Sequence, residues 1–293
     1  MAFLALRAHG KINLYLDVIG RRADGYHDLI TVFQSIGLHD RIAFAEGGYD
    51  IKLEVTGAEL ETGGENLVML AARLLRSYSG AEHGVRIALE KRIPVGAGLG
   101  GGSTDAAATL VGLNRLWNLG LTSEELHELA LQLGMDVPFC LRGGTALAAG
   151  RGEIMERVDL TILPWVVLAY PGFQVSTAWA YRAFDENQSA RNTRAHRTTA
   201  EDVRTRLQRS DLTWCLNRFE EVVFEEFPQL RELANNMKSA GAEAVLLCGS
   251  GSAICGLSNS FGEALKVYRR VAGGTLRVFL THAVGASPTN LVL

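Results

Sequence analysis

The sequence predicts an α+β fold divided into two domains. The chain has 293 residues, which suits one large domain or two moderate ones, and two are favoured. The first part combines alternating strands with a glycine-rich loop that leads into a helix, whereas the last part combines helices with a small antiparallel sheet. We place the change of domain near the apolar strand 164–170 and expect domains at residues 1–160 and 161–293.

Composition excludes several classes of protein. The net charge of −3 gives no electrostatic reason to expect binding to nucleic acid. The four cysteines have no metal-ligand spacing and are expected to be reduced core residues. Only a brief apolar stretch, 3–6, lies near the N-terminus, and the most apolar run, 162–170, is too short to cross a bilayer. We therefore expect a cytoplasmic protein without membrane or nucleic-acid partners. We also expect it to be a monomer or a weak homodimer.

The first strand signal begins at Lys11. Apolar and polar residues alternate from there to Val18, which is the period of a half-buried strand, and Lys11 shares one face with Asn13. A turn at Asp24-Gly25 then precedes an aromatic ring and an imidazole, Tyr26 and His27. These two residues are either an ordinary strand start or part of the lining of a site.

A second strand, 51–55, and a helix from Leu67 follow, and then a third strand, 85–89, leads straight into the glycine loop. Asn66 stands directly before the helix, where it is more simply an N-cap than a ligand contact.

The stretch 94–110 carries the clearest chemical signal. It contains five glycines between Val95 and Ser103 and continues as an alanine-rich helix. Glycine lets a backbone adopt positive φ and approach a ligand closely, and the N-terminus of the helix adds unpaired N–H donors, so a phosphate is the expected guest. The loop is neither a Walker A motif, because no Gly-Lys-Ser/Thr follows, nor a good dinucleotide fingerprint.

A capping box at Thr122-Ser123-Glu124-Glu125 predicts a helix that ends at Gly134. Asp136 follows between apolar neighbours. It is either a desolvated or paired carboxylate that could act as a general base, or a simple turn aspartate.

The last part alternates helices and strands. The polar segment 185–211 predicts a solvated loop and an exposed helix. A helix at 230–237 is followed by strands 245–248 and 253–257, another helix capped by Ser260, and a final strand at 276–280. The turn Gly249-Ser250-Gly251-Ser252 is either a plain hairpin or a second glycine-rich rim that faces the first loop.

Three of these segments together resemble the motifs of the GHMP kinase superfamily: Lys11-Ile12-Asn13, the stretch 94–108 and the stretch 249–253. The blocks 22–27, 98–103, 136–138 and Arg191-Asn192-Thr193 narrow the resemblance to the branch whose substrate carries a cytidine diphosphate. Thr104 stands where a second serine is commoner in this branch. The resemblance implies an N-terminal domain like ribosomal protein S5 domain 2 and a C-terminal ferredoxin-like α/β sandwich.

The resemblance also implies phosphoryl transfer from ATP to an alcohol. In that reading Asp136 takes the hydroxyl proton and Lys11 neutralises charge beside it. Tyr26 and Tyr181 would stack on the cytosine and His27 would hydrogen-bond its edge. The rest of the substrate would contact Asn13 and Thr177.

For ATP, the resemblance implies two groups of residues. The adenine would be bordered by Asn66, Leu67 and Arg92. The phosphates would be held by Pro94, Gly96, Gly98, Leu99, Gly100, Gly101, Gly102, Ser103 and Thr104. Mg²⁺ is expected because ATP brings it, although the sequence shows no dedicated carboxylate cluster.

Two other functions are compatible with parts of this pattern. A GHMP kinase for homoserine or mevalonate would give the two tyrosines nothing to stack on. A non-catalytic module that binds a nucleotide or RNA, suggested by the ribosomal-protein likeness, is disfavoured by the negative charge and by the Lys11 and Asp136 pair.

Overall fold

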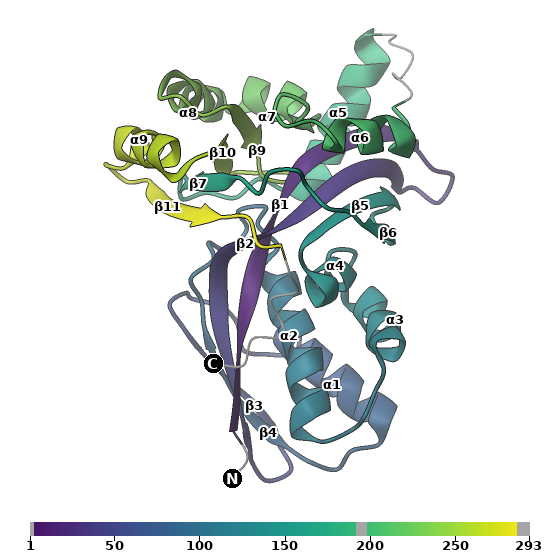
Figure 1. The fold of residues 1–293 in the computed structure, drawn as a ribbon. Coiled ribbons are helices and arrows are strands. Elements are labelled where there is room, and N and C mark those ends of the chain that lie inside the picture. The colour runs from purple at the N-terminus through teal and green to yellow at the C-terminus, as the bar shows by residue number, and fades with distance from the viewer. Residues whose placement is uncertain (1–2, 192–197, 286–293) are drawn as a thin grey trace.

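The computed structural model describes residues 3–191 and 198–285 (Figure 1). Its first sheet has seven strands in the order β3-β4-β2-β1-β8, and β5 pairs with β2 and β6 with β5. The strands are β1 (Phe3–Arg21), β2 (His27–Glu46), β3 (Ile51–Thr56), β4 (Val85–Glu90), β5 (Thr145–Gly150), β6 (Ile154–Arg157) and β8 (Leu216–Asn217).

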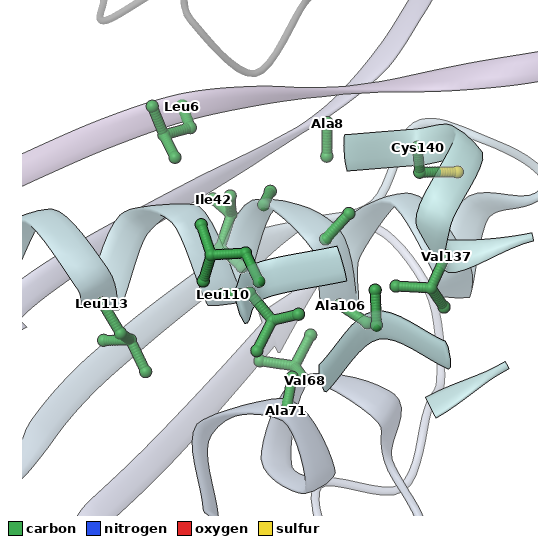
Figure 2. Packing of buried hydrophobic residues seen from close by; sticks show 14 of the residues in the cluster. Leu6, Ala8, Ile42, Val68, Ala71, Ala106, Leu110, Leu113, Val137 and Cys140 are labelled. Atoms are coloured by element: carbon green, nitrogen blue, oxygen red, sulfur yellow. The ribbon is translucent and has the colours of Figure 1, made fainter. Parts of the chain in front are cut away.

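Four helices cover one face of this sheet (Figure 1). They are α1 (Leu67–Ser79), α2 (Gly101–Leu116), α3 (Ser123–Leu133) and α4 (Val137–Arg142). In Figure 2, Ala106 and Leu110 of α2 lie between strand residues such as Ile42 and the α1 residues Val68 and Ala71, and all five are buried. Small side chains let α2 approach both neighbours, which holds the helix start beside the sheet.

The second sheet has four antiparallel strands in the order β11-β7-β10-β9. These strands are β7 (Trp165–Tyr170), β9 (Ala244–Leu247), β10 (Ile254–Ser258) and β11 (Arg277–His282). The helices of this half are α5 (Thr177–Arg191), α6 (Ala200–Leu207), α7 (Glu220–Glu226), α8 (Pro228–Ser239) and α9 (Phe261–Val271). The predicted unit of helices on an antiparallel sheet is confirmed.

Several predicted boundaries are confirmed by their caps. The Asn66 side chain accepts the Val68 N–H at 3.0 Å and so caps α1. Thr122 and Glu125 form the complete capping box of α3, which ends at Gly134.

The prediction of a solvated loop and an exposed helix for 185–211 is correct only in part: α6 exposes Glu201, Asp202 and Thr205. Asp185 lies within α5, and α6 buries Val203 and Leu207 in the core shared with the first sheet. The apolar residues of this segment are few, but they are spaced four apart and therefore share one face of α6.

The two halves are closely joined. β8 comes from the second half of the chain but pairs in parallel with β1 of the first sheet. The predicted division between residues 160 and 161 falls between β6 and β7 and stays a prediction. The four cysteines are free, three of them buried and Cys215 half-buried. Within the described ranges, no helix has the length and apolarity needed to cross a bilayer.

Candidate active site

The glycine loop turns sharply before α2. Gly96, Gly98 and Gly100 have φ values of +67°, +80° and +69°, which L side chains rarely adopt. Gly100 is the N-cap of α2 and supplies no side-chain hydrogen bond, so the first N–H groups of the helix are available to an anion. Ser103 lies inside the first turn of α2 rather than at its cap.

The loop packs directly against the β9–β10 turn. A Cβ atom added to Gly98 would lie 1.8 Å from the Cys248 carbonyl oxygen, so only glycine fits there. The Ala253 N–H donates to the Ala97 carbonyl at 3.2 Å. Both interpretations of the turn 249–252 are therefore correct, since it connects a hairpin and also forms a second rim against the first loop.

A cavity of 560 Å³ opens between this loop and the start of α1. Most of the residues expected to bind ATP line it: Asn66, Leu67, Pro94, Gly96, Gly98, Leu99, Gly100, Gly101, Gly102 and Ser103. Two expected residues lie elsewhere. The Arg92 guanidinium pairs with Glu90 at 2.7 Å, and Thr104 is buried within α2. Their assignment to ATP binding stays a prediction.

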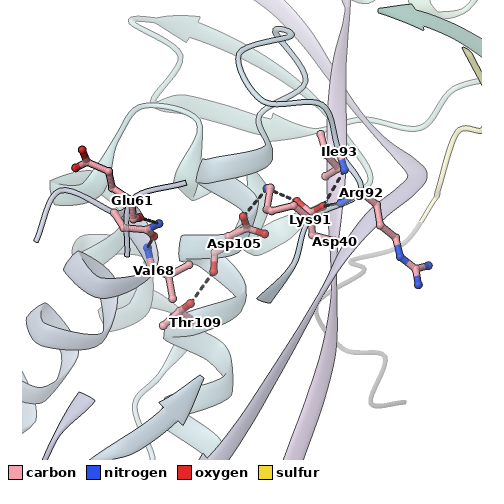
Figure 3. A network of polar contacts seen from close by, with 9 residues as sticks. Asp40, Glu61, Val68, Lys91, Arg92, Ile93, Asp105 and Thr109 are labelled. Atoms are coloured by element: carbon pink, nitrogen blue, oxygen red, sulfur yellow. Dashed lines mark hydrogen bonds and ion pairs between the residues drawn. The ribbon is translucent and has the colours of Figure 1, made fainter. Parts of the chain in front are cut away.

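A buried ionic network lies beneath the loop (Figure 3). The Lys91 ammonium contacts Asp40 and donates to Asp105 Oδ2 at 2.7 Å. Asp40 Oδ1 also accepts the N–H groups of Arg92 at 2.5 Å and Ile93 at 2.8 Å. Burial raises the pKa of Asp105 to about 8, against the opposing charge of Lys91. The network fixes the chain where it enters the loop.

Lys11 and Asp136 meet at the other side of the loop. Their Nζ and Oδ2 atoms are 3.2 Å apart, and the side chain of Lys11 is only 6% exposed against 33% for Asp136. Asp136 is the N-cap of α4 but makes no capping hydrogen bond, so its carboxylate is free to face the ammonium. Sequence reasoning left open whether Asp136 is a paired carboxylate or a turn aspartate, and the structure shows that it is paired.

Strand geometry aims Lys11. A bulge interrupts the β1–β2 ladder between His9 and Lys11, and the Lys11 N–H donates to the Leu99 carbonyl at 2.9 Å. The Lys11 Nζ also donates to Asn13 Oδ1 at 3.0 Å, which confirms that these two residues share one face.

A larger cavity of 990 Å³ begins at this pair. It shares Gly98 and Gly100 with the first cavity, so the two meet at the loop. All the residues expected to bind substrate line it: Asn13, Tyr26, His27, Thr177 and Tyr181. The Thr177 hydroxyl is 2.8 Å from that of Ser250 in the second glycine rim.

The aromatic residues are not arranged as a simple sandwich. The His27 ring stacks on Tyr181, with centroids 4.6 Å apart and an interplanar angle of 22°. Tyr26 is 54% exposed, and the Arg151 guanidinium lies 4.9 Å from its ring centroid. One face of Tyr181 is thus covered by His27, and the expected stacking of a base between Tyr26 and Tyr181 stays a prediction.

Sequence reasoning missed two parts of the site. Asp185 accepts a hydrogen bond from His27 across 158 positions of sequence, and no local pattern marks such a contact. Lys91 gave a weak signal, since it directly precedes the glycine loop. Of the expected block 191–193, Asn192 and Thr193 lie outside the described residues.

Comparisons with known proteins identify the family and the fold of this chain. Residues 66–144 match the family model for the N-terminal domain of GHMP kinases, and residues 196–274 match the model for their C-terminal domain. The 4-diphosphocytidyl-2-C-methyl-D-erythritol kinase of Pelotomaculum thermopropionicum is 47% identical over 90% of this chain and 93% of its own length.

Solved structures show the same relationship. A 4-(cytidine 5'-diphospho)-2C-methyl-D-erythritol kinase is 34% identical with a TM-score of 0.74, covering 96% of this chain and all of its own. The mevalonate kinase of L. major has a TM-score of 0.76 at 15% identity, covering 96% of each chain, which shows the shared fold alone. The predicted two-domain GHMP kinase fold is confirmed.

Proposed function

Because this chain belongs to the 4-diphosphocytidyl-2-C-methyl-D-erythritol kinases of the GHMP kinase family, we propose that it transfers the γ-phosphoryl group of ATP to the 2-hydroxyl of that cytidyl alcohol. The products are the 2-phosphate and ADP. The reaction belongs to the non-mevalonate route to isoprenoid precursors. The observation that carries the proposal is the Lys11 and Asp136 pair, 3.2 Å apart, where the two cavities meet at the glycine loop.

The division of labour follows from the two cavities. The loop and the α2 N-terminus offer backbone N–H groups to the phosphates of ATP, and Asn66 and Leu67 border the adenine end. The cytidyl alcohol occupies the larger cavity, where Asn13 and Thr177 contact it. The γ-phosphoryl group, placed where the two cavities meet at Gly98 and Gly100, then lies between ADP and the hydroxyl of the cytidyl alcohol.

Where the two cavities meet, Asp136 accepts the proton of the attacking hydroxyl while Lys11 stabilises the negative charge that develops on the transferred group. Phosphoryl transfer needs positioning and charge stabilisation more than a covalent nucleophile, and these two side chains supply both. The Lys11 bond to Asn13 keeps the ammonium oriented toward the acceptor.

Mg²⁺ bound with ATP would neutralise phosphate charge. No group of three or more His, Cys, Asp or Glu side chains in residues 3–191 and 198–285 could hold a metal ion. Mg²⁺ at nucleotide sites is usually bound by phosphate oxygens with one or two carboxylates and water, so it needs no such group.

The test replaces Asp136 by Asn, which keeps the size of the side chain but cannot accept the proton. ADP release with the cytidyl alcohol should fall by about 100-fold or more, since general-base catalysis contributes at least that much. ATP binding, followed by calorimetry, should change little because Asp136 lines only the larger cavity.

Two comparisons make the test decisive. Asp50→Asn, an exposed carboxylate that lines neither cavity, should retain wild-type turnover. Wild-type protein should prefer the cytidyl alcohol to homoserine and mevalonate. Full turnover by Asp136→Asn would remove that residue from the role of base, and a preference for homoserine or mevalonate would overturn the assigned substrate.

A further inference from the structure

We propose that Asp185 is a positioning residue that makes His27 selective for cytosine over uracil. This inference rests on the proposed function, because it concerns the end of the larger cavity that would hold the nucleobase. The two residues come from different elements: His27 begins β2 and Asp185 lies on α5. Both line that cavity.

The hydrogen bond between them fixes the tautomer of the imidazole. His27 Nε2 is 2.8 Å from Asp185 Oδ1. A carboxylate can only accept a hydrogen bond, so Nε2 carries a proton and donates it. In the neutral ring the other nitrogen, Nδ1, is then an acceptor. Among the described residues, none hydrogen-bonds to Nδ1.

An acceptor at Nδ1 distinguishes the two pyrimidines. Cytosine presents the N4 amino group, a donor, at the position where uracil presents O4, an acceptor. The Nδ1 lone pair is therefore complementary to cytosine and is repelled by uracil. With uracil, two acceptors, Nδ1 and O4, would face each other without a proton between them. Leaving polar groups unpaired in a buried site costs free energy, so the affinity for uracil is lowered.

Packing holds the imidazole in this orientation. His27 is stacked on Tyr181, and Phe219 meets the same tyrosine edge-on with ring centroids 4.8 Å apart. The His27 side chain is 9% exposed, so the ring has little freedom to turn. The second oxygen of Asp185 faces Arg21 at 3.9 Å, a contact too exposed and too long to compete with the bond to His27.

The first test reads the tautomer in the wild-type protein. Nitrogen NMR of ¹⁵N-histidine-labelled protein, with His27 assigned by loss of its signals in His27→Gln, should show a protonated Nε2 and an unprotonated Nδ1. A protonated Nδ1, with or without a proton on Nε2, would overturn the proposal without any variant of Asp185.

The second test measures specificity with Asp185→Asn. An amide can turn either its oxygen or its NH₂ group toward Nε2, so it no longer enforces one tautomer. The ratio of kcat/KM for the cytidyl alcohol to that for its uridyl analogue should fall by about tenfold or more. Calorimetry should show the same trend for the nucleotides: the preference of the protein for CDP over UDP should be smaller in Asp185→Asn than in the wild type.

Controls separate this inference from the proposed function. Asp28→Asn removes the same charge one residue from His27, but Asp28 is bonded to Arg22, so its specificity ratio should match that of the wild type. If Asp185→Asn does not fold, Asp185→Ala and the wild-type NMR provide the same test. If Asp185→Asn keeps its turnover and its specificity ratio is unchanged, only the role of Asp185 is contradicted. If the wild-type protein is inactive on the cytidyl alcohol, the proposed function is contradicted.

Discussion

At the scale of single residues, the network beneath the loop places two carboxylates around one ammonium in a buried site. Burial raises the pKa of Asp105 to about 8, above its ordinary value of 3.8, so the folded protein holds a proton that the unfolded chain loses. The raised pKa therefore stabilises the folded state. This contribution is complete below about pH 4 and is lost as the pH rises toward 8. The free energy of unfolding should fall over that window by at most about 1.4 kcal/mol per pH unit.

Asp105→Asn carries no titrating group and should lose this part of the pH dependence. Urea unfolding of both proteins at pH 5, 6, 7 and 8 gives the comparison, in which the variant should gain stability relative to the wild type as the pH rises. Parallel pH profiles would show instead that Asp105 is ionised throughout.

The sequence could predict the residues that carry charge in this site but not all of their partners. Lys11 and Asn13 share a face because a strand has a period of two, and that inference needs no tertiary contact. The pairing of Asp185 with His27 depends on how α5 docks on β2, which a local pattern does not encode. Tyr26 was expected to stack, but sequence gave no means to foresee that His27 would cover Tyr181.

At the scale of elements, the contact between the glycine loop and the β9–β10 turn should be intolerant of any side chain at Gly98. Gly98→Ala introduces both a positive-φ alanine and a Cβ atom 1.8 Å from a backbone oxygen. Gly120→Ala is a matched control, since its φ is +69° but its Cβ would meet nothing within 4 Å. The free energy of unfolding of the control should fall by about 1–2 kcal/mol because of the backbone strain alone, and that of Gly98→Ala should fall by clearly more.

Chemical unfolding compares the two variants, and calorimetry should also show weaker ATP binding by Gly98→Ala only. Equal losses of stability in Gly98→Ala and Gly120→Ala would mean that the glycine loop and the β9–β10 turn separate easily.

Caps were the best-predicted features of the elements, because a cap is a local arrangement of a few neighbouring residues, as at Asn66 and Thr122. Of the long strand β2, only a start at Tyr26 and His27 was predicted, as one of two alternatives, and the strand does begin at His27. Its residues 29–36 are all buried, because packing from both halves covers both faces, so the alternation typical of a half-exposed strand is missing.

At the scale of the whole molecule, the two halves share a hydrophobic core and should unfold together. One buried cluster joins Ile12 and Leu14 of β1 to Val166 and Leu168 of β7 and to Leu246 of β9. Separating the halves would expose this cluster, whereas loosely docked domains with separate cores unfold independently. We therefore expect a single cooperative transition although the chain has two sheets.

Tryptophan fluorescence can test this, since Trp117 follows α2 in the first half and the other three tryptophans lie in the second. A protein that retains only Trp117 and a Trp117→Phe variant report on different halves. The midpoint of each in urea should coincide with its own circular dichroism midpoint, because one transition moves both probes. A fluorescence midpoint separated from that of circular dichroism in either variant would show that the shared cluster does not couple the halves. Coupling of this kind keeps both walls of the proposed phosphoryl-transfer site in one body, since Lys11 comes from the first sheet and the turn 249–252 from the second.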